Sequence, residues 1–116
     1  MRNDRKNIIV ERTFDFSVKI IDFVDVLEDK RKFVLANQII KSGTSIGANT
    51  REAQNAESKA DFIHKFKIAA KEADEVQYWL DLCKAAKSYP DPPQDLFLRL
   101  QDIINIISKI IASAKR

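Results

Sequence analysis

The sequence has one cysteine, one histidine, two glycines and three prolines among its 116 residues. A single cysteine excludes an internal disulfide, which suits the cytoplasm, and we expect a cytoplasmic protein. Glycine and proline mark turns, so their scarcity predicts few, long elements. The one histidine, His64, has no second imidazole or thiol near it at helical spacing. We therefore expect a surface histidine, with no metal and no cofactor.

Long apolar runs are also absent. The N-terminus, MRNDRKNIIVER, is charged throughout and lacks the apolar core of a signal peptide. The most apolar segment, Ile103 to Ala114, is interrupted by polar residues and is too short to cross a bilayer. We expect no membrane association.

Neither sign of charge dominates the chain. It has 20 basic and 17 acidic residues, a net charge of +3, and its 32% charged and 45% apolar residues are ordinary for a soluble helical protein. A chain of this length builds one domain with one core. We therefore expect a single domain over residues 1–116, with residues 1–12 as a polar N-terminal arm.

The first apolar segment fits two patterns. Phe14, Phe16, Val18 and Ile20 alternate as in a strand, but from Ile20 onward the apolar residues follow helical spacing. We predict a first helix from about Thr13 to Glu28 and a second from about Lys32 to Asn55. Ser58, followed by Asp61, predicts the N-cap of a third helix that runs to about Ser88, where a proline-rich segment ends it. Asp91 or Asp95 is expected to cap a fourth.

Four amphipathic helices with short connections predict an all-α, antiparallel up-down-up-down four-helix bundle. Gly43 and Gly47 lie four residues apart within the second helix, where each costs about 1 kcal/mol relative to alanine. Such a pair favours close approach of a neighbouring helix. The third helix carries a core seam at alternating steps of four and three: Phe62, Phe66, Ala69, Ala73, Val76, Leu80 and Cys83.

Apolar residues beside the core seams suggest an interface between helices or subunits. Trp79 lies beside the third-helix seam, and Phe97, Ile104 and Ile111 widen the apolar arc of the fourth helix. An exposed arc of this kind indicates a homo-oligomer. The alternative is that these residues only cover the edge of the core.

Catalytic chemistry has little support in the sequence. Cys83 falls on the apolar seam, where an inert thiol is expected, and Glu72 with Glu75 lacks the paired Glu-x-x-His motifs of di-metal bundles. We expect a protein that is not an enzyme. Four polar residues, Ser42, Ser45, Asn49 and Glu52, suggest either a hydrogen-bonded network between helices or a ligand site.

The segment SIGANTREAQNAESKADFIHKFKIAAKEADEVQYWL, preceded by QIIKSGT, resembles the signature of bacterial four-helix-bundle proteins related to those encoded in intervening sequences of 23S ribosomal RNA genes. The resemblance is specific from about Phe33 to Leu82 and implies a ring-shaped homopentamer. The chain is also similar, more distantly, to the accessory variability determinant protein of diversity-generating retroelements, which binds nucleic acid and partners a reverse transcriptase. The resemblance implies no catalytic residues.

Charge gathers at one end of the predicted bundle. An up-down-up-down order brings together the N-terminus, the connection between the second and third helices, and the C-terminus. Nine basic residues fall there: Arg2, Arg5, Lys6, Arg12, Arg51, Lys59, Lys109, Lys115 and Arg116. Five acidic residues oppose them: Asp4, Glu11, Glu52, Glu57 and Asp61. Such an end can bind RNA or DNA through phosphates without reading sequence. The alternative function is a protein-binding scaffold or adaptor without nucleic-acid binding.

Overall fold

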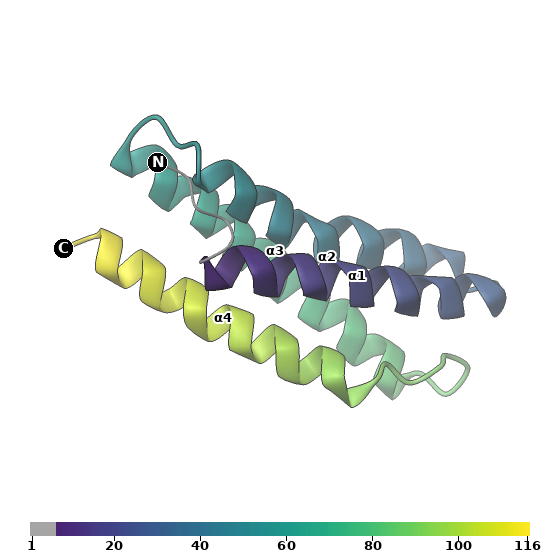
Figure 1. The fold of residues 1–116 in the computed structure, drawn as a ribbon. Coiled ribbons are helices and arrows are strands. Elements are labelled where there is room, and N and C mark those ends of the chain that lie inside the picture. Colours follow the sequence, from purple (N-terminus) through teal and green to yellow (C-terminus); the bar gives the residue numbers. More distant parts are fainter. Residues whose placement is uncertain (1–6) are drawn as a thin grey trace.

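The computed structural model describes residues 7–116, which form four α-helices that run alternately up and down in a bundle of 46 × 22 × 21 Å (Figure 1). The helices are α1 (Ile8–Asp29), α2 (Phe33–Ala53), α3 (Lys59–Ala85) and α4 (Gln94–Ala114). Within this described range there is no strand. The predicted all-α four-helix architecture is confirmed.

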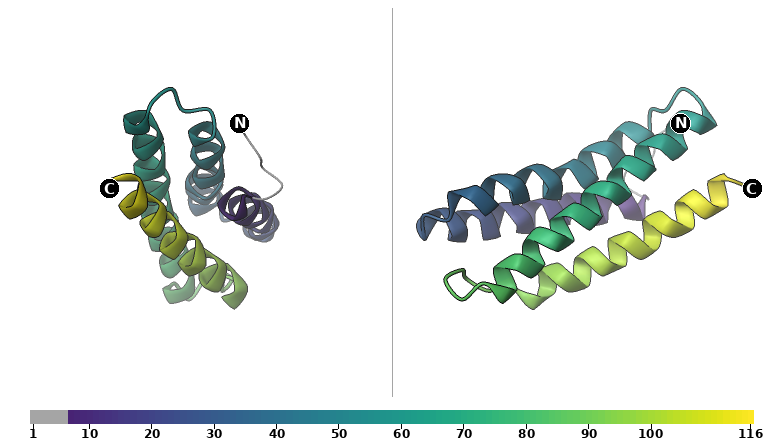
Figure 2. Two further views of the ribbon diagram at one scale, coloured as in Figure 1. Left: turned by 60° about the vertical axis from the view of Figure 1, so that its left-hand side comes forward. Right: turned by 180° about the vertical axis from the view of Figure 1, so that it is seen from behind.

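Each helix packs against two neighbours. Helix α1 contacts α2 and α4, and α3 contacts the same two helices, whereas the Cα atoms of the diagonal pairs never approach within 8 Å. The views in Figure 2 show α1 and α3 at opposite corners of the bundle. The outward faces of α1 and α3 therefore point to different sides of the molecule.

Helix α1 begins five residues earlier than predicted. The side chain of Asn7 accepts a hydrogen bond from the Val10 backbone N–H, and its amide donates to Gln54 Oε1 of the α2 terminus at 2.8 Å. Ile9 is buried, which ties this first turn to the core. The predicted start at Thr13 is wrong because residues 8–12, assigned to a polar arm, form a capped and partly buried helical turn.

The predicted cap of α3 is confirmed, whereas those proposed for α4 are wrong. Ser58 Oγ accepts from the Asp61 N–H at 3.0 Å, and the Asp61 carboxylate accepts from the Glu57 N–H at 3.2 Å. Helix α4 instead follows Pro93, which makes no side-chain cap. Asp95 lies inside the first turn, where its negative charge interacts favourably with the helix dipole. Its carboxylate accepts a hydrogen bond from Arg99 at 2.6 Å. Helix α3 also ends at Ala85, earlier than the predicted Ser88.

The core follows helical spacing on all four helices. The α3 seam is buried from Phe66 to Cys83 as predicted, while Phe62 is half-buried and meets Phe66 edge to face at 5.0 Å. The alternating pattern in α1 resolves as a helix, because Phe16 and Ile20 are fully buried whereas Phe14 and Val18 are exposed.

The two glycines of α2 lie where α1 approaches most closely. A Cβ atom on Gly43 would lie 2.9 Å from Cγ1 and Cγ2 of Ile20. On Gly47 it would lie 3.3 Å from the Thr13 carbonyl oxygen. Both distances are shorter than ordinary van der Waals contact, so the predicted close approach is confirmed and α1 is the neighbour.

Candidate nucleic-acid interface

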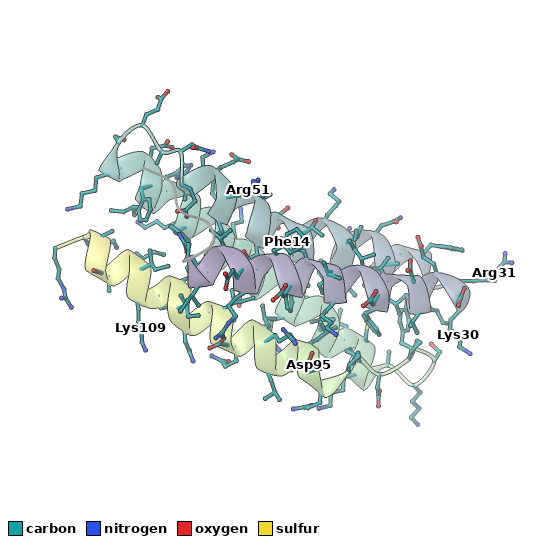
Figure 3. All side chains as sticks on the ribbon, in the orientation of Figure 1. Phe14, Lys30, Arg31, Arg51, Asp95 and Lys109 are labelled. Atoms are coloured by element: carbon teal, nitrogen blue, oxygen red, sulfur yellow. The ribbon has the colours of Figure 1, made fainter. Side chains whose placement is uncertain are left out.

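The topology brings the described basic residues of the predicted site into one half of the molecule. The start of α1, the α2–α3 connection and the end of α4 meet there (Figure 1). Six predicted residues lie in this half, all of them exposed: Arg12, Arg51, Lys59, Lys109, Lys115 and Arg116. Figure 3 shows Arg51 on α2 and Lys109 on α4. The predicted Arg2, Arg5 and Lys6 lie outside the described residues.

Two of the six basic residues are engaged within the protein. The Arg12 guanidinium donates to the Asp102 carboxylate of α4, an acidic residue that was not among the five predicted at this end. Lys59 Nζ donates to the backbone oxygen of Arg116 at 2.9 Å. These contacts tie α1 and α3 to α4, so both side chains have a structural role besides their charge.

One of the opposing acids is itself neutralised. The Glu52 carboxylate accepts from Lys65 Nζ at 2.8 Å, and this hydrogen bond raises the pKa of Lys65. Glu52 is therefore paired across the α2–α3 interface. Within residues 7–116, Arg51, Lys109 and Lys115 form no ion pair with an acidic side chain. The three charges face solvent, where they are available to phosphates.

A groove of about 350 Å³ lies beside Lys115, between α3 and α4. Ala60 and Ile63 line it together with His64, Lys67 and Lys115. Sequence reasoning did not include Lys67 or His64 in the site, although their spacing from Ala60 is that of one helix face. His64 is exposed, in agreement with the predicted surface histidine.

The predicted interface residues of α3 and α4 are half-buried. Trp79, Phe97, Ile104 and Ile111 pack against the core, and Lys84 Nζ lies 5.4 Å from the centre of the Phe97 ring. The exposed apolar side chains lie mainly on α1 instead, where Phe14 is 61% exposed, Val18 44% and Ile21 45%. The helical pattern of α1 contains this signal, since these residues lie off the core face.

Three of the four residues in the polar cluster of α2 form hydrogen bonds within their own helix and not between helices. Ser42 Oγ donates to the Gln38 carbonyl, Ser45 Oγ to the Lys41 carbonyl, and the Asn49 amide to the Ser45 carbonyl. Each group bonds one turn back within its own helix, which satisfies it locally. Only Glu52 reaches across to another helix.

Cys83 is fully buried, and burial raises the pKa of its thiol to about 11. Because the thiolate is the reactive form, we expect Cys83 to resist a disulfide-exchange reagent at pH 8 in the folded protein and to react at once in denaturant. The measurement is absorbance of the released thiol chromophore against time. Rapid stoichiometric labelling of the folded protein would contradict an inert core thiol.

Glu72 and Glu75, the carboxylates compared with those of di-metal bundles, both lie on α3. Burial, followed by the charge of Glu75, raises the pKa of Glu72. Among residues 7–116, no three His, Cys, Asp or Glu side chains are placed to hold a metal ion. No helix in this same range is long and apolar enough to cross a membrane.

The fold places this protein in the class of small antiparallel four-helix bundles. A family model for the 23S rRNA-intervening sequence protein matches residues 5–113, and the chain belongs to this family. The crystal structure of a protein of unknown function from the S23 ribosomal protein family of Bacteroides thetaiotaomicron is similar, with 38% sequence identity and a TM-score of 0.84. The match covers 89% of this chain and 97% of that one. No curated protein matches.

Proposed function

We propose that this protein is a cytoplasmic, non-enzymatic homo-oligomer that binds nucleic acid through its basic end, without a metal or cofactor. The observation that carries the proposal is the exposed group Arg51, Lys109 and Lys115, none of which is paired with an acidic side chain in the described range. Basic side chains of this kind bind phosphates by releasing condensed counterions, without reading sequence.

The similar crystal structure favours this choice of ligand, because its protein is placed in a ribosomal protein family. The description of the matching family refers to the 23S rRNA intervening sequence that encodes such proteins, and it names no ligand. The resemblance to ring-shaped homopentamers implies several binding sites in one assembly, because a ring repeats the basic end in every subunit. Several weak phosphate contacts then act together on one nucleic-acid chain.

The proposal predicts salt-dependent binding that is lost when charge is removed from the basic end. We expect labelled single-stranded RNA to bind the protein at low salt and to dissociate as salt rises. The double variant Arg51→Gln, Lys109→Gln removes two unpaired cations, so the slope of log affinity against log salt should fall by about two per subunit that contacts the strand. Fluorescence anisotropy at several salt concentrations measures both quantities, and duplex RNA and DNA serve as comparison ligands.

A matched control lies at the opposite end of the bundle, where Figure 3 shows Lys30 and Arg31. Lys30→Gln with Arg31→Asn removes the same charge there. Asparagine suits position 31, because Arg31 has a φ of 61°. This control should bind RNA nearly as tightly as the unchanged protein. Equal losses in the two double variants, or no binding at low salt, would refute a basic-end site.

The exposed apolar side chains of α1 favour a second candidate, a scaffold or adaptor that binds another protein. Such a partner would be captured with little dependence on salt. Capture that is lost on changing Phe14 and unaffected by the Arg51 and Lys109 changes would support this second function over the first.

A further inference from the structure

Helix α1 combines an exposed apolar stripe with strong negative charge. Phe14, Val18 and Ile21 follow one another at helical spacing along its outward face. The helix contains six acidic and two basic residues, a net charge of −4 within a chain of +3. Phosphates and anionic lipids are repelled by such a face, so the partner that covers it must be apolar and basic.

The α3–α4 groove has the complementary character. Ala60 and Ile63 supply the apolar part of its lining, and Lys67, Lys115 and His64 form the polar part, its basic rim. Its volume of about 350 Å³ is sufficient for an aromatic side chain. A basic rim also favours an aromatic ring, through cation–π attraction.

These two surfaces lie on different sides of one molecule. Helices α1 and α3 are diagonal in the bundle and do not contact each other, so a chain cannot place its own Phe14 in its own groove. A second copy of the chain can do so. Contacts between two different surfaces propagate head to tail and close into a ring where the rotation permits.

We propose that Phe14 of one copy inserts into the groove of Ala60, Ile63, His64, Lys67 and Lys115 on a second copy, with the acidic face of α1 against the basic rim. The inference rests on the proposed homo-oligomer and assigns its contact. Phe14 is the most exposed side chain of the stripe and lies beside Glu11 on the helix surface, which brings apolar and acidic groups to the groove together.

Mixing two variants tests the head-to-tail contact. Phe14→Ser removes the inserted side chain, and Lys67→Glu reverses a charge on the rim. Each variant alone should run at the mass of one chain in light scattering, where the unchanged protein runs as a larger assembly. An equimolar mixture should form two-chain complexes and nothing larger, because the Phe14→Ser chain keeps its groove and the Lys67→Glu chain keeps its phenylalanine.

Two matched controls accompany the mixture. Leu98→Ser changes an apolar side chain of α4 that is 63% exposed, and Lys30→Glu makes the same charge reversal far from the groove. Both should retain the mass of the unchanged protein, and circular dichroism should show that all four variants are folded.

The outcomes separate this contact from the wider proposal. An assembly that survives Phe14→Ser overturns the contact and leaves the homo-oligomer standing. A mixture that stays at one chain also overturns it, and an unchanged protein of one-chain mass overturns both. Arg51 lines a hollow beside Phe14 and Lys115 lies in the groove, so both adjoin the proposed contact. Lys109 lines neither of these hollows, so an RNA titration of Lys109→Gln tests the basic end independently of these results.

Discussion

Replacing Gly43 with valine is expected to lower the free energy of unfolding by about 3 kcal/mol, although valine is the better helix former. The new Cβ would lie 2.9 Å from two carbon atoms of Ile20, close to the backbone of α1, where the side chain has little freedom to move away. The two helices must separate to relieve this overlap. Chemical denaturation followed by circular dichroism gives the change.

A compensating change at Ile20 distinguishes overlap from a general defect of α2. Ile20→Ala alone should cost about 2–5 kcal/mol, since it opens a cavity in the core. Combined with Gly43→Val, it should cost less than the sum of the two, with a coupling of about 1–3 kcal/mol. Ala48→Val places the same side chain on the exposed face of α2 and serves as the control. Strict additivity of the two core changes would refute direct contact as the cause.

The second large effect is expected at Phe16, which is fully buried on α1. Phe16→Ala should lower the free energy of unfolding by about 3–5 kcal/mol, because it removes a buried ring and leaves a cavity. Phe14→Ala, only two residues away, should change the stability of the separated chain by less than about 0.5 kcal/mol, since Phe14 is 61% exposed.

The comparison is a direct test of helical geometry in α1. In a strand the two phenylalanines would share one face and similar burial, whereas a helix turns them 200° apart. Denaturation at low protein concentration measures folding apart from self-association. Similar losses for the two variants would contradict the burial pattern of α1.

Local patterns in the sequence were sufficient for most of the architecture. The scarcity of glycine and proline predicted few, long elements, and the structure has four long helices. The buried seam from Phe66 to Cys83 and the cap at Ser58 depend on residues a few positions apart, and the structure confirms both. The early start of α1 escaped prediction because Asn7 is held by Gln54, 47 residues away. The caps proposed for α4 are wrong because Pro93 occupies the N-cap position and the helix begins at Gln94.

The character of the surface was decided by the tertiary structure. Sequence placed nine basic residues at one end, but not the contact of Arg12 with Asp102, 90 residues apart, nor that of Glu52 with Lys65. It also placed the spare apolar residues on α3 and α4, whereas those residues pack against the core and α1 holds the exposed stripe. Periodicity along a chain determines which residues share a helix face. Which face meets a neighbour, and which charges meet across it, depends on how the helices pack against each other.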